Sequence, residues 1–203
     1  MKVLKKIHGK SFGYEIWKEY NEFGRETSTN DSTGYWSRTK YDERGYTIHR
    51  YDSLGLDESR IYDENGNLIQ VRSGEHITEQ YFYNDQGNLV RSEFYNGDGK
   101  LKNWNESKYD ERGNCIHTKD SDGNESRCEY NENALPVHLV AEDGSEHWWR
   151  YNENGREIYS KIKTPNGREL ITRYDDEGNV LYSKDFDGFE RWYEYQNGRE
   201  LHG

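Results

Sequence analysis

The chain has 203 residues, of which 39 are acidic and 28 are basic, giving a formal net charge of −11, and only 31% are hydrophobic. Binding to nucleic acid or to an anionic membrane surface needs a cationic patch, so both are disfavoured and a basic protein partner is favoured. The N-terminus is basic without an apolar stretch, and no segment is apolar for long enough to span a bilayer. We therefore expect a cytoplasmic location, although export without a signal peptide would leave the same sequence.

Two short strand-like segments, 3–8 and 14–19, open the chain. A tyrosine followed by an acid or amide then recurs at intervals of 21, 21, 21, 26, 21, 21, 23 and 21 residues. A fixed period of this length predicts a repeat architecture. We interpret residues 1–203 as a single β-hairpin repeat domain, with a capping hairpin at 1–19, eight repeats at 20–194 and a partial repeat at 195–203. The repeat tyrosines are Tyr20, Tyr41, Tyr62, Tyr83, Tyr109, Tyr130, Tyr151, Tyr174 and Tyr195.

Each repeat has the sequence of one hairpin with a turn at either end. In residues 109–129 the turns are 110–113 and 120–123, where Asp bonds the backbone and Gly accepts positive φ. Runs rich in Thr, Ile, Tyr and Val, typical of strands, lie between such turns, and no helical periodicity is sustained. The predicted fold class is all-β, built of tandem antiparallel hairpins. Because neighbouring strands twist by about 20°, so wide a sheet should curve or spiral; a flat sheet held by tyrosine ladders is the alternative.

A small apolar residue lies seven positions after most repeat tyrosines. Stacked repeats bury a shared row that no single repeat can bury alone. We therefore expect one continuous buried row, with a cost of about 2–5 kcal/mol for truncating Ile116 or Ile158 to Ala. The six members of this row are Ile69, Val90, Ile116, Val137, Ile158 and Leu181.

The two cysteines, Cys115 and Cys128, lie on the two strands of one predicted hairpin. A loop at 121–123 with a bulge would place Cys128 opposite Ile116 and the two sulfurs on opposite faces, whereas a four-residue loop would bring the sulfurs together. The expected cytoplasmic location favours free thiols.

One repeat is longer than the others, with 26 residues from Tyr83 to Lys108. We expect its extra residues, around 97–104, to form a protruding loop. Loops on a regular scaffold tend to carry function, so Trp104 is a candidate binding residue.

The motifs YDERGN, YDENGN and YDDEGN, with DxDG turns between them, closely resemble the YD repeats of the rearrangement-hotspot (Rhs) family over about residues 20–203. In large members of that family the repeats form a β-hairpin spiral around a cargo, often a toxin domain. The chain departs from that pattern because it is short for a closed cage, has no DPxGL signature and carries no toxin domain. The resemblance thus implies the fold of a short, stand-alone member, and does not imply encapsulation.

We predict no catalytic residues, no cofactor and no metal site. Residues 120–124 and 185–188 are similar to the start of a calcium loop, but the required twelfth-position Glu is out of frame and turn chemistry accounts for both stretches. The seven histidines show no HxH or HxxxH spacing and are interpreted as solvated strand positions. Nucleophile-elbow, zinc-protease and P-loop motifs are absent from the sequence, so we expect a non-enzymatic protein.

Departures from the repeat pattern point to a partner-binding surface. Trp148 and Trp149 stand where the preceding repeat has Arg127 and Cys128, and Trp192 occupies the first of these slots further along. Adjacent strand residues face opposite ways, so one member of each pair should be exposed, and exposed Trp is a usual anchor of binding surfaces. Packing of all of them into a tyrosine-rich sheet is the alternative. The candidate partner-binding residues are Glu142, Asp143, Glu146, Trp148, Trp149, Glu190, Trp192, Glu194 and Trp104.

The most specific hypothesis for function is a cytoplasmic immunity protein that neutralises a basic toxin, for example a nuclease. The acidic charge and the YD repeats, which the resemblance associates with toxin systems, motivate it. Two alternatives stay open: a carbohydrate-binding module with an aromatic sheet face, and a structural remnant of an Rhs-type shell. The sequence does not predict an oligomeric state.

Overall fold

The computed structural model describes residues 5–11, 14–196 and 199–200. Every regular element in this part of the chain is a β-strand, which confirms the all-β hairpin-repeat fold class. Among the residues described, no helix is long and apolar enough to cross a membrane. The chain divides into two compact units, a first unit of residues 1–83 and 92–104 and a second unit of residues 84–91 and 105–203. The expectation of one repeat domain over 1–203 stays a prediction.

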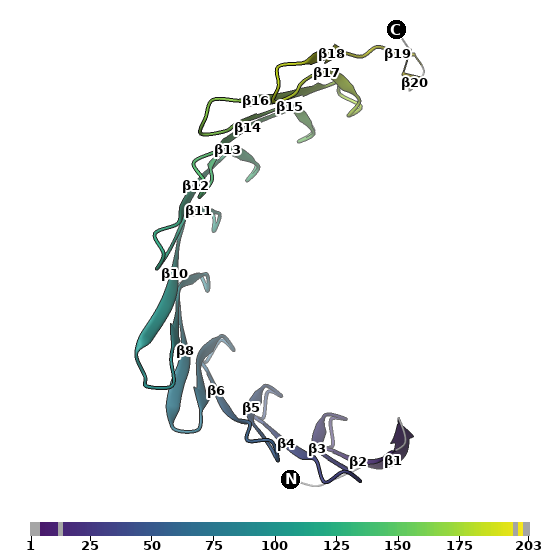
Figure 1. Ribbon diagram of the computed structural model, residues 1–203, viewed down its shortest axis with the longest axis vertical. Helices are drawn as coiled ribbons and strands as arrows, with labels where there is room; N and C mark the ends of the chain where they lie inside the picture. Colours follow the sequence, from purple (N-terminus) through teal and green to yellow (C-terminus); the bar gives the residue numbers. More distant parts are fainter. Residues whose placement is uncertain (1–4, 12–13, 197–198, 201–203) are drawn as a thin grey trace. The chain divides into compact units, whose positions relative to one another are not determined.

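The strands of the first unit are short and follow one another along the chain (Figure 1). They are β1 (Lys5–Ser11), β2 (Tyr14–Tyr20), β3 (Glu26–Asp31), β4 (Trp36–Tyr41), β5 (Thr47–Asp52), β6 (Asp57–Tyr62), β7 (Leu68–Ser73) and β8 (His76–Tyr83). Residues of β9 (Leu89–Tyr95) and β10 (Leu101–Tyr109) are divided between the two units.

The second unit continues the same pattern. Its strands are β11 (Cys115–Asp120), β12 (Glu125–Tyr130), β13 (Pro136–Val140), β14 (Glu146–Tyr151), β15 (Glu157–Lys163), β16 (Glu169–Tyr174), β17 (Val180–Lys184) and β18 (Glu190–Trp192), followed by β19 (Tyr195–Gln196) and β20 (Arg199–Glu200). Within each unit, consecutive strands from β1 to β8 and from β11 to β18 pair antiparallel in one layer (Figure 1). Both faces of this single layer are therefore open to solvent.

The turns form as their sequences predict. Asp110 accepts backbone N–H bonds from Arg112 (2.9 Å) and Asn114 (2.8 Å) through Oδ1, and its own carbonyl accepts one from Gly113. Gly113 has a φ of 85°, in the left-handed region that Gly adopts at little cost. The turn glycines at the other ends of the hairpins, Gly34 and Gly55 among them, have the same conformation.

A β-bulge accompanies the repeat tyrosines and corrects the prediction of a buried aliphatic row. Tyr109 pairs with Cys115 and the preceding Lys108 with His117, so Ile116 is the extra residue and has no partner on β10. Ile69, Val137, Ile158 and Leu181 occupy the same bulge position. None of the six predicted residues is buried, and Ile116 and Leu181 are 36% and 40% exposed. The seven-residue spacing therefore marks a bulge in an uncovered sheet rather than a core.

Side-chain hydroxyls of six repeat tyrosines bond backbone carbonyls of the neighbouring strand. Tyr62 donates a hydrogen bond to the carbonyl of Thr47 (3.1 Å), the residue just before the bulge residue of the neighbouring strand. Tyr130 donates in the same way to the carbonyl of Cys115 (3.1 Å). Equivalent bonds are made by Tyr41, Tyr83, Tyr109 and Tyr151. The hydroxyl of the repeat tyrosine thus provides a hydrogen bond to a backbone carbonyl, which explains why the spacing of these tyrosines is so regular.

Successive turns on the tyrosine side also pack on each other. The Tyr46 ring stacks on Tyr62 (4.8 Å between centroids), and a Cβ added at Gly66 would lie 2.6 Å from the Tyr46 hydroxyl. Arg112 donates to the carbonyl of Glu132 in the next turn (2.5 Å). The turn glycine is thus required at Gly66 for its φ of 90° and also for the close approach of the preceding repeat.

The long repeat does not form the protruding loop predicted around 97–104. Residues 96–100 make an ordinary turn, closed by a bond from Gly99 N–H to the Asn96 carbonyl (2.9 Å), and the other extra residues lengthen strand β10. Strand pairing absorbs these residues because they continue the polar and apolar pattern of a strand. Both cysteines are free thiols, and the register of β11 and β12 (His117 opposite Arg127) continues to Ile116 opposite Cys128, as the bulged-loop alternative requires.

Candidate functional site

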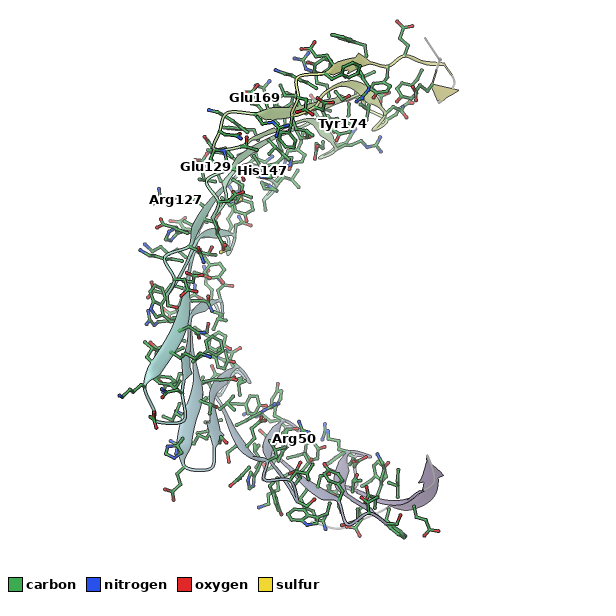
Figure 2. The ribbon with its side chains drawn as sticks, in the orientation of Figure 1. Arg50, Arg127, Glu129, His147, Glu169 and Tyr174 are labelled. Atoms are coloured by element: carbon green, nitrogen blue, oxygen red, sulfur yellow. The ribbon has the colours of Figure 1, made fainter. Side chains whose placement is uncertain are left out.

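The cross-strand register sorts the candidate residues of the second unit onto two faces. We call one of them the charged face. Cross-strand pairing shows that its members include Arg127, Glu129, His138, Glu146, Trp148, Lys161, Glu169, Lys184, Glu190 and Trp192. The opposite face carries Cys128, Leu139, His147, Trp149, Ser160, Thr172 and Ser183. In Figure 2, Arg127, Glu129 and Glu169 lie on one side of the ribbon of this unit and His147 and Tyr174 on the other.

Trp148 lies in a row of side chains on the charged face. Its ring stacks on that of His138 (5.1 Å between centroids, planes 10° apart), and Lys161 Nζ lies 5.3 Å from the ring centroid. His138 and Lys161 are its cross-strand partners on either side. The Trp148 ring is therefore half-buried beside the imidazole of His138 and the ammonium group of Lys161.

A depression of about 490 Å³ surrounds this row, with Glu129, His138, Trp148, Arg150, Tyr159 and Lys161 among its lining residues. The Arg150 guanidinium lies over the Tyr159 ring at 5.1 Å. Lys161 bonds Glu169 (2.7 Å), and this hydrogen bond lowers the pKa of Glu169 and raises that of Lys161. Positive and negative groups alternate here, so the depression has no single sign of charge.

Trp149 lies on the opposite face, paired with Ser160, and its ring is 5.7 Å from that of His147. The two tryptophans therefore cannot contact one flat partner surface together. Glu142 and Asp143 are exposed in the turn before β14, whereas Glu146 is on the charged face beside His138 (3.0 Å). A hydrogen bond from the Ser145 hydroxyl (2.6 Å) is the main cause that lowers the pKa of Asp143.

The second candidate group is more open than the first. Trp192 is 70% exposed on β18, and its ring packs 5.4 Å from that of Tyr182 on the neighbouring strand. Glu190, two residues before it, is on the same face, and Glu190 and Glu194 are both exposed. Trp104 is half-buried on β10 in the first unit, apart from these groups in the chain.

Histidine–carboxylate pairs on the charged face are a feature that the sequence reasoning missed. Nε2 of His49 lies 2.7 Å from Asp57 Oδ1, that of His117 lies 2.8 Å from Glu125 Oε1, and that of His138 lies 3.0 Å from Glu146. In each case the acid follows the histidine by eight residues, on the next strand. Arg127 also bonds Glu125 (2.6 Å), and hydrogen bonds from His117 first and Arg127 second lower the pKa of Glu125 to about 2. The His-x7-acid spacing is the signal that would have found these pairs.

No group of three or more His, Cys, Asp or Glu side chains is placed to hold a metal ion in the residues that the structure describes. The charged face is a surface of short-range polar and aromatic contacts, suited to contact with a macromolecule rather than to enclosing a small ligand.

No family model and no curated protein matches the sequence. The fold is similar to part of a solved TcdB2–TccC3 structure. In the crystal structure of TcdB2–TccC3–Cdc42 the match covers 92% of this chain and 11% of that chain, with 14% identity and a TM-score of 0.53. The TcdB2–TccC3–TEV crystal structure matches over 93% and 13%, with 14% identity and a TM-score of 0.46. The Photorhabdus luminescens Tc holotoxin pore matches over 84% and 12%, with 15% identity and a TM-score of 0.35.

The fold comparison depends on the first of these structures, since its TM-score alone among the three exceeds 0.5. At 14% identity the likeness concerns the hairpin-repeat fold and not the activity. The chain spans about one ninth of the length of that TcdB2–TccC3 chain.

Proposed function

We propose that the chain is a non-catalytic, protein-binding YD-repeat protein, and that it acts in the cytoplasm as an immunity protein against a basic toxin. The observation that carries this proposal is Trp192, 70% exposed, with two exposed acids, Glu190 and Glu194, close to it in the chain. A large aromatic side chain left in water within an acidic surrounding suits a partner that buries the ring and supplies cationic groups around it.

The distribution of charge supports a basic partner. Acids concentrate in the turns at both ends of the hairpins, as at 110–111, 142–143 and 175–177, while the charged face pairs many of its acids with bases. Carboxylates exposed at the turns steer a cationic partner over distances of about a Debye length. Trp192 would then act at short range, after encounter.

The two tryptophan groups are not equivalent in this proposal. Trp148 is half-buried between His138 and Lys161, and Trp149 lies on the other face, so a partner gains less new burial from either. The Trp192 ring packs against the Tyr182 ring, and most of the Trp192 surface is exposed to solvent. We therefore rank Trp192 with Glu190 and Glu194 first, and Glu142, Asp143, Glu146, Trp148 and Trp149 second.

The experiment is co-expression of the chain with each protein encoded beside its gene in a bacterial host, followed by size-exclusion chromatography of the pair. We expect one neighbour to be basic and toxic, and expect the chain to bind it and restore growth. Trp192→Ala should weaken binding roughly 30-fold, mainly through faster dissociation. Glu190→Lys with Glu194→Lys should slow association more than Glu111→Lys with Glu132→Lys, which changes net charge equally elsewhere. Neighbours that are neither toxic nor bound would contradict the proposal.

Carbohydrate binding is the second candidate, and the exposed Trp192 ring beside the half-buried Tyr182 ring favours it, because aromatic rings can stack on sugar faces. Salt dependence separates the two functions. A sugar ligand should lose affinity on Trp192→Ala but be nearly indifferent to reversal of Glu190 and Glu194 and to ionic strength. Affinity for a basic protein should fall steeply as salt rises.

A further inference from the structure

In the second unit the residue just before a repeat tyrosine, such as Glu129, lies on the charged face, and this position is charged in most repeats. Two consecutive repeats of the first unit break this rule, because they carry Ile61 before Tyr62 and Phe82 before Tyr83. Both side chains are 42% exposed. In a repeat protein, apolar residues at an exposed position that is otherwise charged require a reason outside the fold. The charged residues at the equivalent positions are Glu19, Lys40, Lys108, Glu129, Arg150, Arg173 and Glu194.

These two residues belong to one surface depression. Ile61 pairs with Gln70 across β6 and β7, and Gln70 pairs with Gln80 across β7 and β8. Phe82 follows Gln80 by two residues and so shares its face. The depression has a volume of about 500 Å³, and Ile61, Ile69, Gln70, Gln80, Phe82 and Asp63 are among its lining residues. Two apolar walls thus flank a pair of side-chain amides.

The polar groups of the depression favour particular contacts. The Gln70 amide oxygen accepts a bond from Arg72 Nε (2.8 Å) and that of Gln80 accepts one from the Tyr95 hydroxyl (2.8 Å). Their Nε2 hydrogens, which donate to no other described side chain, are the groups left to bond a partner's carbonyl. Hydrogen bonds from Asn67, first from its side-chain amide, lower the pKa of Asp63, so this lining carboxylate is ionised at neutral pH.

We propose that this depression is a docking site for a segment of another protein that presents one large apolar side chain next to Lys or Arg. The apolar side chain inserts between Ile61 and Phe82, the segment's carbonyls accept from the two glutamines, and its cation pairs with Asp63. The inference rests on the proposed protein-binding function and adds a contact surface in the first unit. Contact of this kind matches the buried apolar anchor with a polar rim that protein interfaces use.

A second copy of the chain is the less suitable occupant. Its three most exposed apolar side chains are Leu54 (83%), Trp192 (70%) and Phe23 (68%). Leu54 lies beside Asp52 and Phe23 beside Glu22, and Trp192, although it follows Arg191, lies within two residues of both Glu190 and Glu194. Insertion of any of the three would bring a carboxylate toward Asp63, and like charges brought together oppose association. Charge complementarity therefore selects a basic segment.

The test uses fluorescein-labelled peptides and fluorescence anisotropy with the full chain. The probe Lys-Lys-Gly-Phe-Gly-Lys-Lys should bind, and peptides with Ser in place of Phe, or Glu in place of Lys, should bind at least 10-fold more weakly. Ile61→Lys and Phe82→Lys should each weaken binding at least 10-fold. Lys stands at the same repeat position as residues 40 and 108, so these variants should fold, which circular dichroism checks. Lys40→Ala is the control and should bind as the unaltered chain does.

Failure of the unaltered chain to bind the probe would overturn the proposal, as would equal binding by the Lys variants or equal affinity for the Ser or Glu peptides. Sedimentation velocity tests the other occupant: concentration-dependent dimers that Phe82→Lys abolishes would assign the depression to a second copy and also overturn it. Growth protection by the chain through Trp192 is measured independently, so peptide failure would leave the immunity proposal standing.

Discussion

Within a single repeat, the turn beside the repeat tyrosine, which we call the turn edge, keeps the same contacts in most repeats, whereas the residues of the charged face vary. At the edge, the same contacts recur: Asp or Asn accepts backbone N–H groups, Gly has positive φ, and the repeat Tyr bonds a carbonyl 15 residues earlier, as from Tyr62 to Thr47. On the face, equivalent positions carry Lys40, Ile61 or Glu129. The edge therefore builds the fold, and the face is free to vary, which is why departures on the face are the more informative guide to binding.

This difference also explains how a chain of low hydrophobic content forms sheets of hairpin repeats within each of its two units. Among the described residues, Val71 is the one apolar side chain that is buried (6% exposed). Stability must come largely from strand pairing, tyrosine bonds to the backbone and turn contacts repeated many times, each small. Edge substitutions should therefore cost more than face substitutions, and the following predictions test that order.

The largest effect is expected at Gly66. Replacing it with Ala imposes an unfavourable φ of 90° and drives Cβ against the Tyr46 ring, so we expect a loss of about 2–3 kcal/mol. Gly55→Ala is the matched control, because its φ is 96° but nothing lies within 4 Å of an added Cβ. It should cost about 1–2 kcal/mol. Equal urea-unfolding curves for the two variants would show that packing between successive turns does not contribute to the free energy of unfolding.

Val71→Ala should cost about 2 kcal/mol, because two buried carbons are removed and a void is left. Ile116→Ala removes more carbon, but from a bulge residue that is 36% exposed, so we expect about 1 kcal/mol, below the range predicted from sequence. Thermal unfolding of both variants measures the contrast. A larger loss at Ile116 would restore the view that the bulge row is a core.

Tyr62→Phe should cost about 1 kcal/mol, since it deletes the hydrogen bond to the Thr47 carbonyl while keeping the ring. Tyr174→Phe is the control, because the Tyr174 hydroxyl has no such bond among the described residues. Its unfolding midpoint should stay within error of the unaltered chain. Indistinguishable losses for the two would mean that the hydroxyl acts through solvation rather than through the bulge carbonyl.

The smallest effect concerns pH. The pKa of Glu125 is about 2 in the folded chain, below the unfolded value of about 4.3, so its ionised form stabilises the fold. That contribution is complete above the unfolded pKa and is lost as pH falls toward 2. Glu125→Gln should therefore flatten the dependence of urea stability on pH between these values. An unchanged slope would show that the His117 and Arg127 contacts do not hold the carboxylate in solution.

The parts of the structure that the sequence predicts are those governed by local chemistry. Turn residues such as Asp110 and Gly113 specify their own conformation, so hairpin boundaries and fold class follow from the repeat. Burial does not follow in the same way, because it depends on whether a second layer covers the sheet, and a bulge residue such as Ile116 has the same sequence signature as a core residue. The long repeat was misjudged for a related reason, since its extra residues pair as strand instead of looping out.

Site prediction divides along the same line. The placement of Trp148 and Trp149 on opposite faces follows from strand alternation. Alternation also predicts one exposed member of each aromatic pair, but Trp148 and Trp149 are both half-buried, whereas Trp192 is exposed. The His138–Trp148–Lys161 row needs the register of three strands. Ile61 and Phe82 were missed although the sequence contains their signal, a charged position that turns apolar in two consecutive repeats. An alignment of the repeats on the residue before each repeat tyrosine makes this change from charged to apolar visible.

The most direct test of the division between edge and face is the thermal unfolding midpoint of one triple variant, Ile61→Lys, Phe82→Lys and Trp192→Arg. Each new residue is one that another repeat carries at the same position, as at Lys40, Lys108 and Arg127. If the face carries binding and the edge carries the fold, the midpoint should stay within about 3 °C of the unaltered chain, equivalent to about 1 kcal/mol. A fall of about 10 °C or more would show that these side chains hold the repeats together, and would contradict the account.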